Sequence, residues 1–245
     1  MLKHSVSSVG KVCINNKKFT TFTIKTKSHE LKKFRVMQLP THRYEEYIDC
    51  RMKYYVTYEI THQIAGIPDS EEAMQEYKEI MYKTCKDPSV SNVICCLDNE
   101  DNQIVGISTQ KLIKRGDREE EIKPRTKPVK RFYEILRTWN NLFPIPELMK
   151  NFNLTTYCDD MGFAIHPQYS GIGLANKMAP LRREVCKLQG APMTGAWMTS
   201  PGTKNACARD GWEVIYEISY EELGRILGIK FENAPPSCAY MISKI

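Results

Sequence analysis

One run of the sequence, residues 161–178, holds the residue types and spacing most able to do chemistry. An apolar, strand-like segment passes there through a turn containing Pro167, Gly171 and Gly173 into a helix-like segment. The N-terminus of a helix exposes unpaired N–H groups and the positive end of the helix dipole. Glycines at that point let an anionic ligand approach the backbone closely. The run therefore predicts a cradle for phosphate groups, and so a phosphorylated cofactor; a helix cap with no ligand is the alternative.

Two common phosphate-binding motifs do not fit this run. No Gly-x4-Gly-Lys-Ser/Thr stretch exists, and Asn176 stands where a Gly-x-Gly-x-x-Gly fingerprint needs its third glycine. What remains is Gln168-x-x-Gly171-x-Gly173 between a strand and a helix. This pattern resembles the acyl-CoA pyrophosphate loop of the GCN5-related N-acetyltransferases (GNATs).

The resemblance implies acetyl-CoA as the cofactor, held mostly by backbone groups. Strand amides would face the thioester and the pantetheine arm, loop amides would face the pyrophosphate, and Ser170 would add a hydroxyl. The cofactor-binding residues expected on this basis are Phe163, Ala164, Ile165, Gln168, Tyr169, Ser170, Gly171, Ile172, Gly173, Leu174, Ala175 and Asn205. No metal is expected, because the nine cysteines are irregularly spaced and form no Cys-x-x-Cys pair.

Length and composition are typical of a soluble globular protein. The chain has 245 residues, of which 42% are hydrophobic and 26% charged, which suits one large domain. We find no apolar run of membrane-spanning length and no apolar signal at the N-terminus, so we expect a cytoplasmic protein with reduced cysteines and no membrane partner. The net charge of +6 leaves nucleic-acid binding open, through the basic residues of 1–30 and 111–130, but no recognition motif supports it.

Hydrophobic periodicity and turn residues predict a mixed α/β chain. Strands are expected at 34–39, 91–97, 103–112, 155–165, 194–199, 212–220 and 238–244. Helices are expected at 41–60, 70–83, 132–140, 146–150, 174–188 and 205–210. Residues 1–30 would form an arm or a hairpin with 19–24 as its second strand, and residues 31–245 a single domain with an insertion at 115–153.

The order of these elements from residue 34 onward resembles the GNAT fold, and four stretches resemble its insect arylalkylamine N-acetyltransferase branch. They are residues 34–37, 58–60, 168–175 and 211–236. The fold implied is α+β, with a central, mixed, mostly antiparallel and twisted sheet that is flanked by helices and splayed at the acetyl-CoA site. The activity implied is transfer of an acetyl group to the primary amine of a small arylalkylamine, of the dopamine, serotonin, tyramine or octopamine type, by direct transfer in a ternary complex of a monomeric enzyme.

Acyl transfer to an amine needs a group that takes the amine proton, and Glu59 is our candidate. The resemblance puts Glu59 at the position of the family's catalytic Glu, acting through water, and we expect burial to raise its pKa. His62, three residues on, is the competing base. Thr199 and Thr203 are carried over as hydroxyls of the catalytic centre; ordinary turn residues are the alternative.

The general acid for the leaving thiolate stays open. The family often has His after its terminal prolines, where this chain has Ser237. It often has Tyr in the helix that follows the motif's Asn, whereas the helix expected from Asn205 offers only Cys207 nearby.

An aromatic cluster is the candidate pocket for the acceptor: Tyr54, Tyr55, Tyr58 and Phe143, beside Trp139. Aromatic residues at helical spacing also form ordinary cores. Asp159 and Asp160 keep open an acceptor such as agmatine or a polyamine, and a protein amine or a longer acyl donor also stays open. An acyl-CoA binder without activity is a further alternative, against which Glu59 and the intact loop argue.

Overall fold

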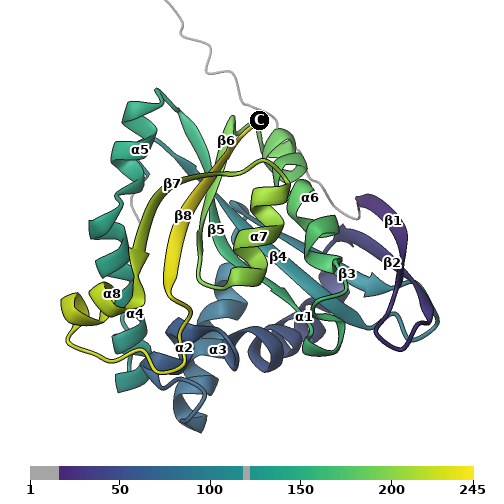
Figure 1. The fold of residues 1–245 in the computed structure, drawn as a ribbon, viewed down its shortest axis with the longest axis horizontal. Helices are drawn as coiled ribbons and strands as arrows, with labels where there is room; N and C mark the ends of the chain where they lie inside the picture. Colours follow the sequence, from purple (N-terminus) through teal and green to yellow (C-terminus); the bar gives the residue numbers. More distant parts are fainter. Residues whose placement is uncertain (1–16, 118–121) are drawn as a thin grey trace, which may run out of the picture.

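In the part of the chain that the structure describes, residues 17–117 and 122–245, eight strands form one sheet in the order β1-β2-β3-β4-β5-β6-β8-β7 (Figure 1). The structure is a computed structural model. The strands are β1 Lys18–Lys25, β2 Leu31–Gln38, β3 Val90–Leu97, β4 Ile104–Lys114, β5 Thr156–Ile165, β6 Met193–Met198, β7 Glu213–Ser219 and β8 Ser237–Lys244. Every neighbouring pair is antiparallel except β5 and β6, which run parallel. The expected mixed and mostly antiparallel sheet is confirmed.

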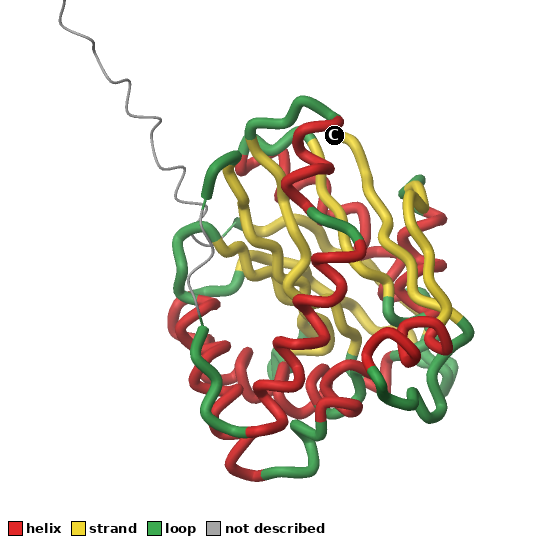
Figure 2. Tube along the Cα trace, turned by 90° about the vertical axis from the view of Figure 1, so that its left-hand side faces the viewer, coloured by secondary structure: helices red, strands yellow, loops and turns green. Residues whose placement is uncertain are grey.

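Helices cover both faces of this sheet (Figures 1 and 2). They are α1 Tyr44–Arg51, α2 Ile60–Ala65, α3 Glu71–Cys85, α4 Lys127–Leu142, α5 Ile145–Asn151, α6 Leu174–Gln189, α7 Pro201–Arg209 and α8 Tyr220–Leu227. Strand β3 shows why both faces are covered, since all of its residues are buried. Its Ile94 and Cys96 pack with residues of α1, α3 and α4, whereas Val93 and Cys95 pack with residues of α6. Alternate side chains of one strand thus enter two separate cores.

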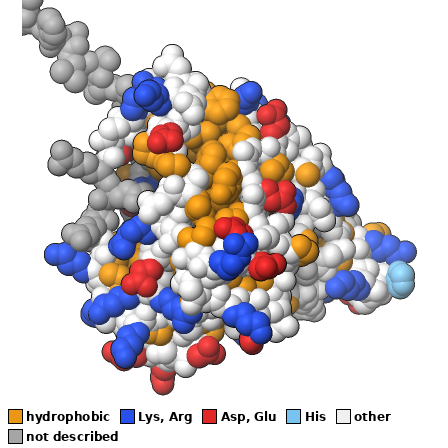
Figure 3. Space-filling view, turned by 60° about the vertical axis from the view of Figure 1, so that its left-hand side comes forward, with side chains coloured by type: hydrophobic (Ala, Val, Ile, Leu, Met, Phe, Trp, Pro, Cys, Tyr) orange, Lys and Arg blue, Asp and Glu red, His pale blue; other side chains and the backbone are white. Residues whose placement is uncertain are grey.

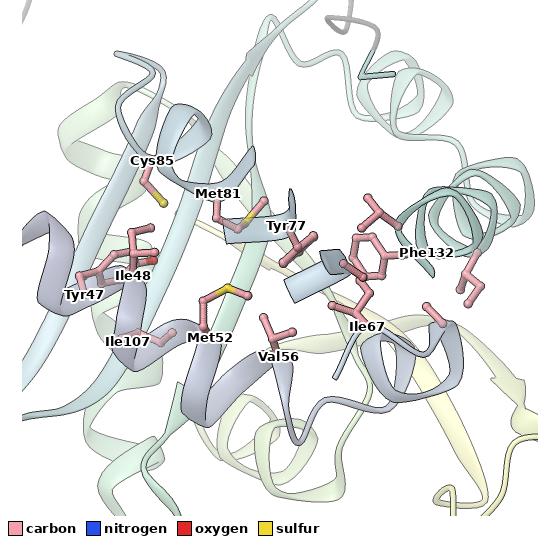
Figure 4. Close-up of a cluster of buried hydrophobic side chains, with 14 of the residues drawn as sticks. Tyr47, Ile48, Met52, Val56, Ile67, Tyr77, Met81, Cys85, Ile107 and Phe132 are labelled. Atoms are coloured by element: carbon pink, nitrogen blue, oxygen red, sulfur yellow. The ribbon is translucent and has the colours of Figure 1, made fainter. Parts of the chain in front are cut away.

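The larger core lies between the sheet and the helices α1 to α4 (Figure 4). Tyr47 and Ile48 of α1 lie near Ile107 of β4, and Tyr77 of α3 packs on Phe132 of α4 with ring centroids 5.2 Å apart. All five side chains are almost fully buried. Burial of a large apolar side chain stabilises the fold by roughly 1.5–3 kcal/mol, so this core holds α1 and the segment after it firmly in place.

The segment after α1 breaks where we predicted a continuous helix over residues 41–60. A 3-10 turn, η1 (Thr41–Arg43), precedes α1, and one turn of π-helix, η2 (Met52–Val56), follows it. The N–H groups of Tyr58 and Glu59 both donate to the carbonyl of Tyr55, at 3.0 and 2.9 Å. Glu59 then adopts an extended conformation (φ −81°, ψ 129°) and becomes the N-cap of α2. The prediction was wrong because apolar residues keep a helical spacing across the break, so their periodicity does not reveal it.

The N-terminal hairpin also differs from the prediction. β1 pairs with β2 through a turn at residues 26–30 and not with residues that precede it. The strand expected at 19–24 is β1, whereas the hairpin turn expected across Asn15-Asn16 lies outside the described residues. The boundary expected at residue 30 therefore falls inside the β1–β2 turn, and β1 is part of the same sheet as the other strands.

Helix α8 was not predicted, although the sequence carries both of its end signals. Ser219 caps its N-terminus by accepting a hydrogen bond from the N–H of Glu222 at 3.0 Å. Gly228 ends it in the left-handed conformation at φ 64°. Residues 212–220, assigned to a strand, instead divide between β7 and the first residue of α8.

The parallel pair β5–β6 is joined at one position only, where Cys158 pairs with Thr194. Beyond that point the strands separate, as the resemblance implied. β5 also carries a bulge, because a register shift between Thr109 and Gln110 of β4 leaves Met161 without a partner. Bulges redirect side chains and are frequent beside active sites. The bulge and the separation both lie just before the glycine-containing turn.

Figure 3 turns the side that carries α4, α5 and β7 towards the viewer and shows hydrophobic side chains gathered along its middle. Val214 of the edge strand β7 is 46% exposed, and Phe152, just after α5, is 39% exposed.

Across residues 17–117 and 122–245, no helix has the length and apolar character needed to cross a membrane. The same residues contain no group of three or more His, Cys, Asp or Glu side chains arranged to hold a metal ion. The eight cysteines within these ranges are all unpaired.

Candidate functional site

A cavity of about 520 Å³ lies where β5 and β6 separate. Its lining includes most of the residues that the sequence suggested for separate roles, namely Tyr54, Tyr55, Tyr58, Glu59, Phe163, Ala164, Ile165, Tyr169, Ser170, Gly171, Gly173, Leu174, Ala175, Thr199, Thr203 and Asn205. Among the described residues, the lining does not include Gln168, Ile172 or Phe143. Candidate catalytic, cofactor and acceptor residues therefore face one common space.

Glu59 enters this cavity from the N-terminus of α2, with a side chain that is only 8% exposed. Its Oε2 accepts from the backbone N–H groups of Thr61 (3.0 Å) and His62 (3.1 Å), from the Thr61 hydroxyl, and from His62 Nδ1 (2.6 Å). All hydrogen bonds that Glu59 makes through its side chain to the described residues converge on this one oxygen. Oε1 is consequently the carboxylate oxygen left for a group in the cavity.

These contacts reverse the pKa shift that we expected for Glu59. Burial favours a raised pKa, but the hydrogen bonds from His62 and Thr61 outweigh it, so the pKa of Glu59 lies below its ordinary value. The expectation of a raised pKa was wrong because it counted desolvation and not the donors at the helix N-terminus. Glu59 is therefore a carboxylate at neutral pH.

His62 does not line the cavity, and its side chain is almost fully buried. Burial lowers the pKa of His62, so its imidazole is neutral at pH 7. A carboxylate only accepts hydrogen bonds, so Nδ1 carries the proton towards Glu59, and Nε2 accepts from the hydroxyl of Tyr77 at 2.9 Å. The ring is also stacked on Phe132 at 4.4 Å. His62 thus orients Glu59 and lacks the access that a base for a bound amine needs.

The glycine-containing turn presents a row of backbone N–H groups. After a 3-10 turn, η3 (Pro167–Tyr169), Gly171 and Gly173 adopt left-handed conformations at φ 79° and 90°. Gly173 is the N-cap of α6 and supplies no side-chain cap. The N–H groups of residues 171–175 donate to no acceptor within the described chain. Such a row at the positive end of a 16-residue helix fits an anion, phosphate above all.

A ring contact, tilted by 48°, connects this turn to the η2 segment that follows α1. The Tyr54 ring lies 4.0 Å from that of His166, and the His166 N–H donates to the carbonyl of Val105 at 2.8 Å. His166 Nδ1 in turn accepts from the N–H of Gln168 at 3.1 Å. Gln168 therefore faces His166 through its backbone, consistent with its absence from the cavity lining.

Of the three β5 residues expected to bind the cofactor, Phe163, Ala164 and Ile165, two direct their backbone N–H groups away from β4 and towards the cavity side. The N–H of His166 points to β4, where Val105 accepts it. Directions alternate along a strand, so the N–H of Ala164 also points to β4, whereas those of Phe163 and Ile165 point away from it. Because β6 has already separated from β5 there, no strand takes up these two N–H groups.

Arg51 of α1 fixes the bulge beneath these amides. The guanidinium is almost fully buried. Its Nη2 donates to the carbonyl of Met161, and its Nη1 lies 3.3 Å from the hydroxyls of Tyr47 and Thr109. Gly162 has φ 128°, and a Cβ added there would lie 2.9 Å from Arg51 Nη2. The glycine thus makes room for the arginine, and the arginine holds the carbonyl of the bulge residue.

Of the two aspartates before the bulge, only Asp160 lines the cavity. Its Oδ1 lies 2.7 Å from Nη2 of Arg182, a fully buried residue of α6 that also donates to Ser108 Oγ at 3.1 Å. Asp159 accepts from the hydroxyl of Tyr240 at 3.4 Å. The negative charge of Asp160 is therefore compensated within the protein.

The predicted hydroxyl residues lie at the start of α7. The carbonyl of Thr199 accepts from the Tyr220 hydroxyl at 3.0 Å. Ser200 caps the helix by accepting from the N–H of Thr203 at 3.3 Å, and the two hydroxyls are 2.9 Å apart. Cys207 is buried outside the cavity lining, and burial raises its pKa to about 12, which makes it a poor proton donor.

Aromatic residues form one wall of the cavity. Tyr54, Tyr55 and Tyr58 come from the segment around η2, and Trp197 comes from β6. Phe143, expected in this wall, instead packs 4.5 Å from Tyr240 in a separate hydrophobic cluster. Phe143 directly follows α4, and its ring also lies 5.9 Å from that of Tyr216, so it belongs to the packing of this segment on β7 and β8.

Sequence reasoning missed three lining residues that shape the site. Trp197 lies in a predicted strand, and its stacking on Trp139 of α4 (5.2 Å, 24°) joins the predicted insertion to the cavity. Arg182 was not singled out because arginine on a helix normally faces solvent. Asn176, noted only as a missing glycine, also lines the cavity.

Solved structures of insect proteins share this arrangement of strands and helices. A protein of the yellow fever mosquito Aedes aegypti that carries the name arylalkylamine N-acetyltransferase 7 superposes with a TM-score of 0.82, at 22% identity, over 95% of this chain and 97% of its own. Mosquito arylalkylamine N-acetyltransferase like 5b gives a TM-score of 0.68 at 16% identity, over 86% and 100%. Polyamine N-acetyltransferase of Drosophila melanogaster, which catalyses the formation of N-acetylagmatine, gives 0.62 at 14% identity, over 86% and 100%.

No protein-family model and no curated protein matches the sequence. At these levels of identity, the likeness to solved structures concerns the fold. The separated β5–β6 pair and the turn before α6 are arranged as the resemblance implied. The chain has the GNAT fold.

Proposed function

We propose that this protein is an acetyl-CoA-dependent N-acetyltransferase that acetylates the primary amine of a small arylalkylamine by direct transfer in a ternary complex. One observation carries the proposal: the Glu59 carboxylate, the free edge of β5 and the unpaired N–H groups of Gly171, Gly173, Leu174 and Ala175 line one cavity. Acyl transfer to an amine needs these three kinds of group together.

The residues present fit an acyl-CoA donor. The N–H groups of residues 171–175 would hold its pyrophosphate, and the edge of β5 would hold its pantetheine arm through backbone hydrogen bonds. When bound, acetyl-CoA would supply the activated acetyl group. The left-handed Gly171 and Gly173 support this assignment, since they aim successive N–H groups at one concave surface.

Glu59 would receive the proton of the amine. An alkylamine is protonated at neutral pH, with a pKa near that of lysine, about 10.4. The ionised carboxylate attracts the ammonium group through the accessible Oε1, and His62 and Thr61 keep Oε2 fixed. Because the pKa of Glu59 is lowered, its carboxylate acts chiefly by binding the ammonium and by passing the proton to water.

The N–H groups of Phe163 and Ile165 would stabilise the negative charge that develops on the donor's carbonyl oxygen. Both point away from β4 on the edge that β6 leaves free. Preorganised donors of this kind each contribute roughly 2.7–4 kcal/mol to transition-state stabilisation in other acyl transfers. A thiol is a stronger acid than an amine (the cysteine thiol has a pKa of about 8.5, lysine about 10.4), so a leaving thiolate needs less help from an acid than a leaving amine would.

The wall of Tyr54, Tyr55, Tyr58 and Trp197 supports an aromatic acceptor. Agmatine is the second candidate, because Asp160 faces the cavity and would attract its guanidinium. The ion pair of Asp160 with Arg182 favours the first candidate, since it leaves Glu59 as the main uncompensated negative charge beside the acceptor.

A thiol-release assay tests the proposal. Purified protein would be mixed with acetyl-CoA and, in separate reactions, with tryptamine, dopamine, agmatine, spermidine and a lysine-containing peptide. We expect release of free thiol with the arylamines at rates well above those with agmatine. Release with agmatine alone would favour the second candidate, and release with none of the amines would refute the proposed activity.

A further inference from the structure

The β1–β2 hairpin packs against the turn that precedes α6. Phe22 and Phe34 of the hairpin share a hydrophobic cluster with Tyr169 and Ile172 of the turn, and Phe34 meets Tyr169 edge to face at 5.8 Å. The Nζ of Lys32 lies 5.9 Å from the centre of the Tyr169 ring. Figure 1 shows the hairpin beside α6, so two segments far apart in the sequence form one surface.

The tip of this hairpin places Lys27 directly against the glycine turn. A Cβ added to Gly171 would lie 3.7 Å from Cε of Lys27 and 3.9 Å from its Nζ. Two hydrogen bonds close the tip, from the Thr26 N–H to the Glu30 carbonyl (2.8 Å) and from the His29 N–H to the Thr26 carbonyl (3.0 Å). A closed turn therefore fixes the backbone from which the exposed Lys27 side chain extends towards Gly171.

The charge of Lys27 is not used within the described chain. Its side chain forms no ion pair with a described residue, and Glu30, the carboxylate nearest in sequence, lies 3.6 Å from Lys32 Nζ instead. Beside Gly171, the neighbouring backbone groups are the unpaired N–H groups of residues 171–175, which carry partial positive charge. An exposed lysine next to such a row, with no ion-pair partner among the described residues, fits a ligand with more than one negative charge.

We infer that Lys27 is a binding residue for the pyrophosphate of coenzyme A, contributed by the hairpin across the turn. This inference rests on the proposed function and extends it, because the backbone alone would otherwise carry the phosphate contact. A lysine acts here as a point charge with a flexible stem, and its contribution falls as salt screens it.

Isothermal titration calorimetry, which measures the dissociation constant of coenzyme A from the full chain, tests the inference. We compare the wild type with Lys27→Gln and Lys27→Arg, and with Lys25→Gln as a matched loss of charge on the exposed end of β1. We expect Lys27→Gln to weaken binding about five-fold at low salt, the size of a partly exposed charged contact, and Lys27→Arg and Lys25→Gln to leave it nearly unchanged. The difference between wild type and Lys27→Gln should shrink at high salt.

The remaining outcomes of the titration separate the role of Lys27 from the proposed function. Equal affinities of wild type and Lys27→Gln, or equal losses in Lys27→Gln and Lys25→Gln, overturn the role of Lys27 and leave the proposed function standing. A loss that disappears when dephospho-coenzyme A replaces coenzyme A overturns the assignment to the pyrophosphate. Absence of coenzyme A binding by the folded wild type refutes the proposed function, and the inference with it.

Discussion

His62 Nδ1 lies 2.6 Å from Glu59 Oε2, within the first turn of the helix that Glu59 itself caps. One carboxylate oxygen therefore serves the helix and the imidazole, and the other serves the cavity. This division ties the candidate catalytic group to the local fold. Any substitution of Glu59 affects both the N-cap of α2 and the candidate catalytic carboxylate. A test of the catalytic role therefore needs a variant that keeps the cap.

Replacement of Glu59 by Gln should reduce kcat/KM for arylamines at least about 100-fold, because the amide carries no charge and accepts no proton. Its carbonyl oxygen still accepts from the N–H groups of Thr61 and His62, so the helix cap is largely kept. The measurement is thiol release with acetyl-CoA, normalised to folded protein by circular dichroism. Glu71→Gln, in the exposed first turn of α3, is the matched control and should retain full activity. Retained activity of the Glu59 variant would remove Glu59 from the mechanism.

The pH dependence of kcat/KM should follow the amine and not Glu59. Because the pKa of Glu59 is lowered, its carboxylate does not titrate near neutrality. We expect kcat/KM to rise about ten-fold per pH unit until the amine loses its proton, and amines of lower pKa should reach the plateau at lower pH. If kcat/KM instead rose with an apparent pKa near neutrality that was the same for amines of different pKa, a group of the enzyme would control the rate, and the proposed protonation state of Glu59 would be contradicted.

Stability should fall as the pH drops below about 6.5. Burial holds the pKa of His62 below its ordinary value, so the unfolded chain binds this proton first and is favoured as the pH falls. The lowered pKa of Glu59 acts in the same direction, since its contribution is present above the unfolded pKa and is lost as the pH falls through the folded value. Denaturant titration between about pH 5 and 7.5 measures the slope, and His62→Asn, which keeps a donor to Glu59, should reduce it. A stability that stays constant or rises towards acid would refute this account.

Arg51→Met should lower kcat about 10- to 100-fold while leaving coenzyme A affinity nearly unchanged. The variant frees the carbonyl of Met161 and lets the bulge shift, and small misplacements next to reacting atoms are costly. It should also lower the free energy of unfolding by roughly 1–3 kcal/mol, because a buried acceptor loses its donor. Separate measurements of kcat, affinity and denaturant midpoint distinguish the two effects. Equal losses of kcat and affinity would indicate general damage, and Arg51 would then have no positioning role.

Gly171→Val should raise the apparent KM for acetyl-CoA strongly or abolish binding. Valine disfavours φ 79°, and its side chain would enter the surface that the N–H groups of residues 171–175 form. Gly190→Val is the matched control, since Gly190 has φ 72° with open space around it at the other end of α6. Both variants carry the backbone strain, so only the first should lose the cofactor. Similar KM values for the two variants would argue against a phosphate cradle at Gly171.

The turn and α6 were predicted accurately because local residues specify them. The segments 155–165 and 174–188 match β5 and α6 to within one residue at each end. Glycines in left-handed conformations and an apolar strand act over short distances, so the sequence alone reveals them.

Features that depend on distant parts of the chain were not predictable in this way. The break at Tyr58 and Glu59 requires the π-helical turn η2, which apolar periodicity does not signal. The lowered pKa of Glu59 depends on how α2 begins after that break. The burial of Arg51 and Arg182 depends on strands more than 50 residues away in sequence, as the bond of Arg182 to Ser108 shows. Tertiary contacts decide these features.

The stacked pair of Trp139 and Trp197 gives the chain a built-in optical probe. The sequence holds three tryptophans, and two of them form this pair, with Trp197 at the cavity wall. The third, Trp212, is buried and hydrogen-bonded to Asp210 at 3.1 Å. An aromatic amine that settles against Trp197 would alter the emission of the stacked pair over a constant background from Trp212, so acceptor binding can be followed by intrinsic fluorescence without turnover, label or donor.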